Sequence, residues 1–381
     1  MKIEAVDGDP IPFRASPYAT VAVIGAGSWG TALAATAARS GARVRLWGRN
    51  RQVVDAINRT HRNDRHLADV PLPSRLAAVH DMANALAGAE AVLIVVPSRS
   101  VRSVARQVAE YIGPDVPVAI CAKGIEDETG LLMTQVAAEE LGARPLGTVS
   151  GPTFARETAL NHPTAATVAF PFSHADRLAP ATSPAARLAL TLTTESFRAY
   201  VSDDLVGVEV CGAVKNVIAI ACGMMSGAGF AENTRAALIT RGVDEMKALA
   251  EALGGRRETV TGLSGIGDLT LTCSSTTSRN MTLGMQLGQG IARADCFDGR
   301  PVVVEGEANA RSVTDLARRA GVAMPICEAV RAVLHEGAHL GRTFAGLWSR
   351  PIEAEPRALA LSLDHPAADA AIAALAERIH A

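Results

Sequence analysis

The sequence predicts an α/β protein in which an N-terminal Rossmann-type, doubly wound sheet precedes an all-helical C-terminal domain. Three observations support this prediction. A β-branched run at 20–24 leads through a glycine turn into a helix-length segment, continuous apolar runs typical of buried parallel strands follow, and from 203 to about 345 the patterns are overwhelmingly helical. Because 381 residues exceed the size that one core usually supports, two domains are expected.

Four segments are expected along the chain: a loose N-terminal arm at 1–19, a dinucleotide-binding domain at 20–202, a helical substrate and catalytic domain at 203–348 and a C-terminal tail at 349–381. The arm is proline-bearing and lacks the apolar region of a signal peptide. The most apolar later stretch, 205–230, is interrupted by charged residues and glycines, so it predicts a buried core helix and no membrane span.

Composition excludes several function classes. The formal net charge is −2 and the basic residues are scattered, so nucleic acid is not an expected partner. The six cysteines form no CxxC pair and no histidine lies at ligand spacing from them, so no metal site is expected. Scattered cysteines of this kind are typical of reduced, core-filling thiols in a cytoplasmic protein.

The glycine turn after the first strand has GxGxxG spacing, with glycines at Gly25, Gly27 and Gly30. The first glycine permits a tight turn, the second lets a pyrophosphate approach the backbone, and the third lets helix and strand pack closely. The N–H groups at the helix start then face the phosphates. Because a second strand follows at 43–47, we predict dinucleotide binding in preference to an ordinary turn of small residues.

Arg49 follows the second strand, where a site that prefers NAD usually places an acid. An arginine there can neutralise a 2′-phosphate, so NADP(H) is favoured as cofactor and NAD(H) is the alternative. A helix at about 51–60 then leads into a polar loop that ends at His66, which either contacts phosphate or is merely solvated.

Three further strands end in polar or small residues. The run at 91–96 ends before Ser98, the run at 116–121 leads to Lys123, and a strand at 146–149 opens into the small-residue loop 150–155. Ligands of open α/β sheets bind outside the carboxyl ends of the strands, so Ser98 and Lys123 are expected at the cofactor cleft. The alternative for Lys123 is an exposed loop lysine.

Two more strands are expected at 164–169 and 196–201. The proline-bearing stretch between them, 171–188, is weakly patterned and predicts a surface excursion. The helical region that follows divides into predicted helices at 205–224, 233–253, 258–262, 279–290, 306–320 and 326–337.

Lys215 lies in the middle of the first of these helices, with apolar or small residues on both sides. Burial disfavours an ammonium group and lowers its pKa, which makes a lysine a general acid or base near neutral pH. The alternative is a lysine that extends its amino group to water beside a buried helix. The small residues of this helix, Gly212 among them, predict close packing where the domains meet.

Two other polar groups stand out in the helical region. Asp268 lies in a predicted glycine loop at 265–272, and Ser278, Arg279 and Asn280 stand together near a helix start. Arginine supplies a rigid fork of donors that suits phosphate or carboxylate. The alternatives are that Asp268 caps a helix and that Arg279 is a surface residue. Together with a dinucleotide fold, these groups indicate a site with a hydride-carrying cofactor, a lysine whose pKa can be shifted, a carboxylate that orients this lysine and an arginine that binds an anion.

The motifs in this order resemble those of the bacterial NAD(P)-dependent glycerol-3-phosphate dehydrogenases, over about 20–348. They are GAGSWGTAL at 25–33, KG at 123–124, SGPTFA at 150–155, GAVKNVIA at 212–219, RG at 241–242, GDL at 267–269, SRN at 278–280 and VEG at 304–306. The resemblance implies a cytoplasmic homodimer that reduces dihydroxyacetone phosphate to sn-glycerol 3-phosphate for phospholipid synthesis. It also implies a helical domain of the 6-phosphogluconate dehydrogenase type.

The resemblance further implies roles for individual residues. Lys215 is the acid–base catalyst. The residues that orient this lysine and the substrate oxygens are Asp268, Asn216 and Thr272. The residues that hold the substrate are Lys123, Gly151, Thr153, Ser278, Arg279 and Asn280, with Arg279 on the phosphate. The cofactor contacts beyond the three glycines are Ser28, Trp29, Arg49, Lys123, Ala155, Arg279, Val303 and Glu305.

Two alternatives stay open at this point. A 6-phosphogluconate or 3-hydroxyacid dehydrogenase also places a lysine on the first helix of its helical domain, but would lack the paired GDL and SRN motifs. A dinucleotide-binding sensor or scaffold without turnover would have no reason to retain Lys215, Asp268 and Arg279 together.

Overall fold

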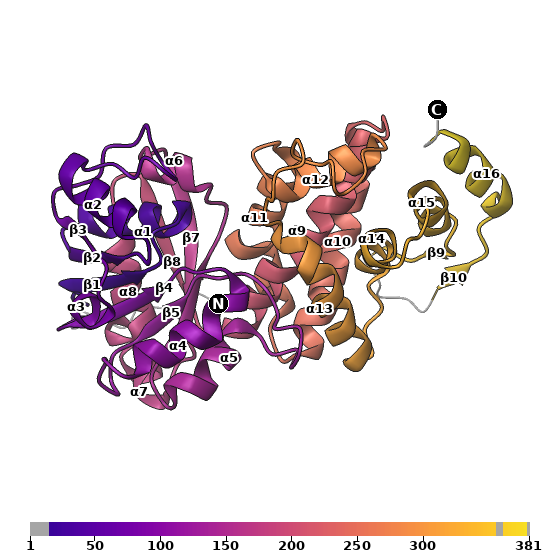
Figure 1. Ribbon diagram of the computed structural model, residues 1–381. Helices are drawn as coiled ribbons and strands as arrows, with labels where there is room; N and C mark the ends of the chain where they lie inside the picture. Colours follow the sequence, from indigo (N-terminus) through magenta and orange to yellow (C-terminus); the bar gives the residue numbers. More distant parts are fainter. Residues whose placement is uncertain (1–14, 356–360, 379–381) are drawn as a thin grey trace.

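A computed structural model describes residues 15–355 and 361–378 and shows a sheet domain beside a helical domain (Figure 1). Residues 1–14 of the predicted arm therefore lie outside the described residues. The end of that arm is anchored, because Tyr18 is buried and its backbone N donates to Thr191 Oγ1 at 2.8 Å. The fold class expected from the sequence is confirmed.

The first domain is built on an eight-stranded sheet of order β3-β2-β1-β4-β5-β6-β7-β8. The strands are β1 (Thr20–Ile24), β2 (Arg43–Trp47), β3 (Leu76–Val79), β4 (Ala91–Ile94), β5 (Val118–Ile120), β6 (Leu146–Ser150), β7 (Thr164–Ala169) and β8 (Phe197–Ser202). Strands β1 to β6 are parallel, and β7 pairs antiparallel with β6 and parallel with β8. The strand order reverses between β1 and β4, which is the point where such sheets bind nucleotides.

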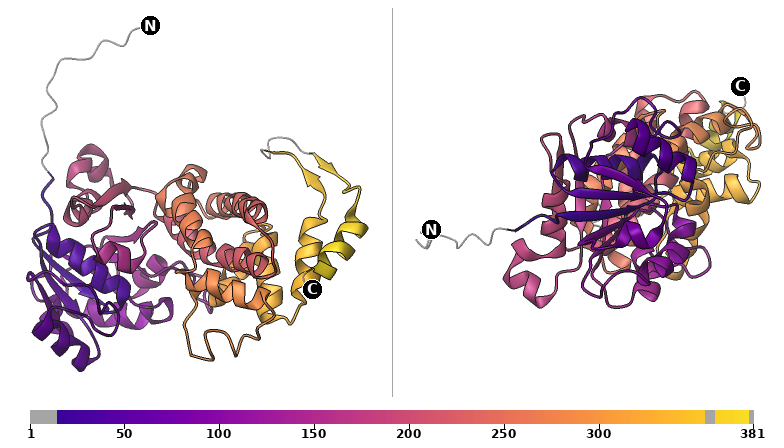
Figure 2. Two further views of the ribbon diagram at one scale, coloured as in Figure 1. Left: turned by 90° about the horizontal axis from the view of Figure 1, so that it is seen from above. Right: turned by 60° about the vertical axis from the view of Figure 1, so that its left-hand side comes forward.

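Helices cover both faces of the sheet (Figure 2). They are α1 (Ser28–Arg39), α2 (Arg51–Thr60), α3 (Met82–Leu86), α4 (Val101–Ala109), α5 (Met133–Leu141), α6 (Ala155–Ala159), α7 (His174–Leu178) and α8 (Pro184–Leu192). Apolar side chains of α1, α2 and α8 form the core on one face, and those of α3, α4 and α5 form the core on the other.

The prediction of a surface excursion at 171–188 is wrong for its second half. Helix α8 buries Ala185, Leu188 and Leu192 in the core that contains α1. The sequence pattern was hard to recognise because the helix is short and begins at Pro184, the residue type favoured at the first helical position.

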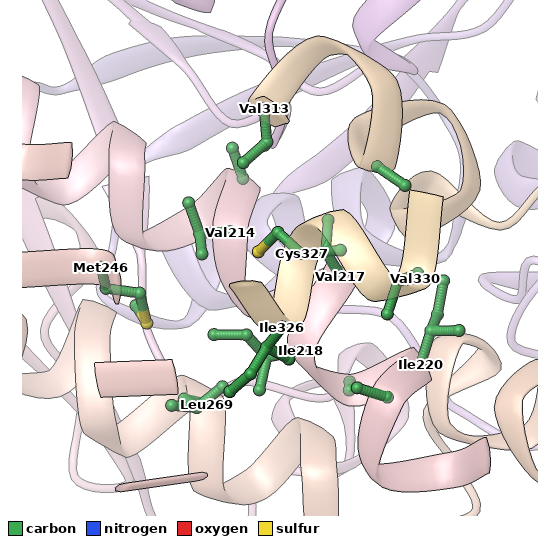
Figure 3. Close-up of a cluster of buried hydrophobic side chains, with 14 of the residues drawn as sticks. Val214, Val217, Ile218, Ile220, Met246, Leu269, Val313, Ile326, Cys327 and Val330 are labelled. Atoms are coloured by element: carbon green, nitrogen blue, oxygen red, sulfur yellow. The ribbon is translucent and has the colours of Figure 1, made fainter. Parts of the chain in front are cut away.

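The second domain surrounds one central helix, α9 (Leu205–Gly227), whose N-cap Asp204 accepts from Gly207 N at 2.9 Å. The other helices are α10 (Glu232–Ala252), α11 (Asp268–Ser274), α12 (Arg279–Gly288), α13 (Glu305–Arg319), α14 (Pro325–His335) and α15 (Leu340–Trp348). Side chains of α9, α10, α11, α13 and α14 converge in the core (Figure 3). Helix α9 is long and apolar enough to cross a membrane, yet 89% of its most apolar window is buried inside the protein.

One local prediction in this domain needs correction. The predicted glycine loop before Asp268 is a π-helical turn, Leu263–Gly267, which continues directly into α11. Within the described part of the predicted tail, β9 (Ile352–Glu353) pairs with β10 (Ser362–Leu363), and α16 (Ala368–Arg378) packs on α15. These tail elements lie at the end of the helical domain that is remote from the sheet (Figure 2).

Candidate active site

Lys215 is buried at the centre of α9, with 6% of its surface exposed. Its Nζ donates to Asp268 Oδ1 at 2.5 Å and to Thr272 Oγ1 at 3.0 Å. Both partners lie on α11, which packs against α9. The amino group therefore ends on a carboxylate inside the protein, and the alternative that it extends to water is excluded.

Asp268 joins this helical cluster to the sheet domain. Its second oxygen, Oδ2, accepts from Lys123 Nζ at 2.6 Å. Lys123 follows β5, at the carboxyl edge of the sheet, and its side chain passes over Gly212 of α9. A Cβ at Gly212 would lie 3.3 Å from Lys123 Cγ, so the glycine gives the lysine room. Two lysines from different domains thus share one buried carboxylate.

Lys123, Lys215 and Asp268 shift one another's pKa values. The pKa of Lys215 is lowered from 10.5 to about 8, mainly because burial disfavours its charge; Asp268 opposes this shift and the Lys123 charge adds to it. Burial alone would raise the pKa of Asp268, but Lys123 and Lys215 hold it below its usual value. Burial would lower the pKa of Lys123, but Asp268 raises it above its usual value. Lys215 is therefore the member of the cluster that can exchange a proton near neutral pH.

Asn216, next to Lys215, is the centre of a second polar group. Its Oδ1 accepts from Asn280 Nδ2 at 2.9 Å, and its Nδ2 donates to Glu305 Oε2 at 3.4 Å. Asn280 Oδ1 in turn accepts from Gly306 N at 2.9 Å. This network ties α9 to the starts of α12 and α13, so it places Glu305 beside the lysine helix.

The rest of the Ser278-Arg279-Asn280 motif begins α12. Ser278 is the N-cap, and its Oγ accepts from Met281 N at 3.3 Å. Arg279 is exposed, and its Nη1 donates to the carbonyl of Val303 at 2.7 Å. The structure thus brings together Arg279 and Val303, which the sequence linked only through resemblance.

The glycine turn has the shape that a dinucleotide needs. Gly25 has φ +127°, a left-handed conformation, and a Cβ there would overlap the Val95 carbonyl. A Cβ at Gly30 would overlap the carbonyl of Gly25. A Cβ at Gly27 would meet no atom within 4 Å, so this glycine borders open space at the N-terminus of α1. The residues present fit a pyrophosphate at the helix start.

Three side chains beside this turn also have informative surroundings. The indole Nε1 of Trp29 is buried and has no hydrogen-bond partner among the described residues. Ser28 Oγ donates to the His66 carbonyl at 3.3 Å. Asn63, which the sequence analysis missed, is fully buried and donates to the Ala26 carbonyl at 3.0 Å and to Thr31 Oγ1 at 2.8 Å. At least part of the polar loop that ends at His66 therefore braces the glycine turn.

The loop after β6 reaches the helical domain. Gly151 packs so closely that a Cβ would lie 2.8 Å from Ala166 Cα, and Thr153 Oγ1 donates to the Gly151 carbonyl at 3.2 Å. A Cβ at Gly267, just before Asp268, would lie 3.6 Å from Pro152 Cγ. Ala155 is the first residue of α6.

Two polar residues flank the cluster and one lies apart from it. A Cβ at Gly124 would lie 3.1 Å from both Ser98 Cβ and Asn309 Oδ1. Ser98 is therefore at the same sheet edge as Lys123. Asn309 was missed, although an amide on the apolar face of the predicted helix at 306–320 could have indicated it. Arg49 is exposed after β2, and no hydrogen bond joins it to the Lys215 cluster within the described part of the chain.

The structure places a glycine turn with room for a dinucleotide and a buried lysine–carboxylate cluster at the same edge of the sheet. This combination is typical of NAD(P)-dependent oxidoreductases that have a separate helical domain. Comparison with known proteins narrows this class. Residues 20–176 match the model of the NAD-dependent glycerol-3-phosphate dehydrogenase N-terminus, and residues 204–344 match that of the C-terminus. The chain belongs to the NAD-dependent glycerol-3-phosphate dehydrogenase family.

Individual relatives agree with this assignment. The glycerol-3-phosphate dehydrogenase [NAD(P)+] of Rhodospirillum rubrum is 47% identical over 335 residues, covering 88% of this chain and 93% of that protein. The enzyme of the same name from Maricaulis maris is 45% identical and covers 89% and 99%. The crystal structure of glycerol-3-phosphate dehydrogenase from Coxiella burnetii aligns with a TM-score of 0.79 at 38% identity, over 89% of this chain and all of that one.

Proposed function

We propose that this chain catalyses the reversible, NAD(P)H-dependent reduction of dihydroxyacetone phosphate to sn-glycerol 3-phosphate, which supplies glycerophospholipid synthesis. The observation that carries the proposal is the buried cluster of Lys215, Asp268 and Lys123 at the carboxyl edge of the dinucleotide sheet. The identity of the substrate is inferred from membership of the glycerol-3-phosphate dehydrogenase family.

Lys215 acts as the general acid of the reduction. The nicotinamide, when bound, supplies the hydride for C2 of the substrate. The Lys215 ammonium transfers one proton from Nζ to the carbonyl oxygen, which leaves an alcohol and a neutral amine, and the reverse reaction returns the proton to Nζ. The pKa of about 8 suits both directions, because proton transfer is most efficient when the pKa lies near the working pH.

The neighbours of Lys215 orient it. Asp268 and Thr272 both accept from Nζ, which leaves the third N–H direction of the ammonium for the substrate. Asn216 is held by Asn280 and Glu305, so it fixes the wall of the site beside the lysine.

Substrate and cofactor are assigned to the surrounding residues. The substrate is held by Lys123, Gly151, Thr153, Ser278, Arg279 and Asn280. Arg279 pairs with the phosphate, since its exposed guanidinium keeps further N–H groups besides the one that binds Val303. The cofactor contacts are Gly25, Gly27, Ser28, Trp29, Gly30, Arg49, Lys123, Ala155, Arg279, Val303 and Glu305. A preference of the enzyme for NADP(H) is supported by Arg49, because an arginine at this position can neutralise the 2′-phosphate.

We also propose a cytoplasmic homodimer. The six cysteines are free and buried, which is consistent with a reducing compartment. The partners are then a small phosphorylated substrate and the cofactor, with no role for nucleic acid.

The test follows NADPH absorbance with dihydroxyacetone phosphate, and separately with 3-hydroxyacids and 6-phosphogluconate in the oxidative direction. Lys215→Met should lower turnover by a factor of about 10² to 10⁴, because a proton donor commonly contributes that much, while the Kd of the cofactor changes little. Lys247→Met on α10 is the matched control and should keep normal turnover. No NADPH oxidation with dihydroxyacetone phosphate would overturn the function, and near-normal turnover of Lys215→Met would place the proton donor elsewhere.

A further inference from the structure

A second buried carboxylate joins the two domains. Glu209 lies on α9, ahead of Lys215, and is 7% exposed. It accepts from the backbone N of Thr134 at 2.9 Å and also from the Thr134 hydroxyl. Thr134 lies in the first turn of α5, in the sheet domain. A carboxylate of one domain therefore caps a helix of the other, at the helix end where negative charge is stabilised.

The segment that leads from Lys123 to α5 is compact. Ile125 bridges to Leu132, and Glu126 N donates to the Leu131 carbonyl at 2.9 Å, so the chain folds back on itself immediately after Lys123. Ile125 and Leu132 are buried in the core of the helical domain. A shift of α5 relative to α9 would therefore be carried to Lys123.

Lys123 and Glu209 also lie close together. They line one small cavity, together with Gly212, Thr148 and Ser150. Both ends of the segment therefore contact α9. Lys123 packs over Gly212 of α9 and donates to Asp268 of α11, and Thr134 donates to Glu209 of α9.

We propose that Glu209 is a positioning residue for the reaction, which sets the placement of Lys123 against Lys215 by capping α5 from α9. This inference rests on the proposed function. Glu209 makes none of the hydrogen bonds of Lys215, so it acts through the backbone of α9 and α5. A displacement of about 1 Å at a reacting centre costs on the order of 10²-fold in rate, so a link between the domains has a large effect on turnover.

The chain offers a matched control in Glu245. This glutamate lies on α10, is 5% exposed, and accepts from Ile326 N at 2.5 Å and Cys327 N at 3.2 Å, in the first turn of α14. Burial raises the pKa of both Glu209 and Glu245 to about 7. The two carboxylates therefore have the same chemistry, but Glu245 caps a helix of its own domain.

The experiment compares Glu209→Gln, Glu245→Gln and Thr134→Val with the unmodified protein. Both glutamine variants should lower the unfolding temperature by similar amounts. Only Glu209→Gln should also lower kcat with dihydroxyacetone phosphate, by about 10- to 100-fold, with the KM for the cofactor nearly unchanged. Thr134→Val removes only the hydroxyl donor, so it should lower kcat less, and its effect should not add to that of Glu209→Gln.

A second readout needs no substrate. The groups that act on Lys215 are Asp268, Lys123 and Glu305, and burial dominates its lowered pKa. If the domains loosen and water enters, the pKa of Lys215 rises, and competitive acetylation of Lys215 measured against pH by mass spectrometry should shift upward in Glu209→Gln and not in Glu245→Gln.

These measurements separate the two proposals. No turnover by the unmodified protein overturns the proposed function, and the acetylation profile then still tests Glu209. Equal kcat and equal acetylation profiles for Glu209→Gln and Glu245→Gln would overturn the positioning role. If Glu209→Gln does not fold, Thr134→Val gives the answer, because normal kcat in that variant contradicts the proposal.

Discussion

Replacement of Asp268 by asparagine removes the charge that Lys123 and Lys215 share while keeping the side-chain shape. The Nζ of Lys215 lies 2.5 Å from Asp268 Oδ1, so the two charges are centred within about 4 Å of each other. At an effective dielectric constant of about 20, such a pair interacts by about 4 kcal/mol, which is about a 1000-fold change in the proton affinity of Lys215. Asp268→Asn should therefore lower the pKa of Lys215 well below about 8.

The consequence is a turnover loss that depends on pH. With a pKa of about 8, the unmodified protein keeps about ten protonated Lys215 groups for each neutral one at pH 7. A 1000-fold loss of affinity leaves about one protonated group per hundred, so the reduction should slow by about 100-fold at pH 7. In the proposed mechanism the protonated form of Lys215 is the active one, so kcat of Asp268→Asn should rise again as the pH is lowered, by about tenfold per pH unit at first.

The assay is the kcat profile for NADPH oxidation from pH 5 to 9, at saturating dihydroxyacetone phosphate. Thr272→Val is the control, because it removes an uncharged acceptor at 3.0 Å from the same Nζ, and should move the profile much less. A loss in Asp268→Asn that is equal at every pH would refute the electrostatic argument and leave Asp268 a purely geometric role.

Three further predictions concern residues that we propose to bind the cofactor or the substrate. Gly27→Ala should keep the unfolding temperature but raise the Kd of the cofactor, because the added Cβ meets no protein atom and enters the space proposed for the phosphates. Gly30→Ala should instead destabilise the fold, because its Cβ would overlap the Gly25 carbonyl. Calorimetry and cofactor titration of the two variants check both expectations. Arg49→Ala should lower kcat/KM for NADPH more than for NADH, and an equal change for both would contradict the 2′-phosphate assignment. Arg279→Ala should raise KM for dihydroxyacetone phosphate, and an equal effect on unphosphorylated dihydroxyacetone would argue against a phosphate clamp.

The features that the sequence predicted well are local ones. Strands β1 and β2 have the predicted bounds, because each is a short β-branched or alternating run that ends at a turn signal. The glycine turn was recognisable because its function depends on backbone shape, which glycine spacing encodes directly. Lys215 was recognisable because a single cation in an apolar helix contradicts the local pattern, and such conflicts concentrate at functional sites.

The features that were missed depend on partners far along the chain. Asn63 looks like one more polar residue in a polar loop, and only its bonds to Ala26 and Thr31 show that it braces the glycine turn. Glu209 looks like an isolated carboxylate on α9 until Thr134 is placed against it. No local pattern encodes such pairs.

The small residues of α9 serve two different contacts. At Gly212 the missing side chain makes room for Lys123, as expected for a domain junction. Later in the helix, added Cβ atoms at Gly223 and Gly227 would overlap the backbone of α12, and those at Gly284 and Gly288 of α12 would overlap the backbone of α9. The four-residue spacing on both helices gives a glycine face that brings the two backbones together.

This close packing bears on the chemistry because Asn280 lies on α12. With α9 and α12 in backbone contact, Asn280 reaches Asn216 at 2.9 Å and Gly306 at the start of α13. The glycine face therefore fixes the wall beside Lys215, while Asp268 and Glu209 fix the side that faces the sheet domain. A buried ammonium tolerates its desolvation only when its partners are held in place. In this protein the rigidity of α9 against both neighbours is thus what allows Lys215 to remain buried, paired and able to release its proton.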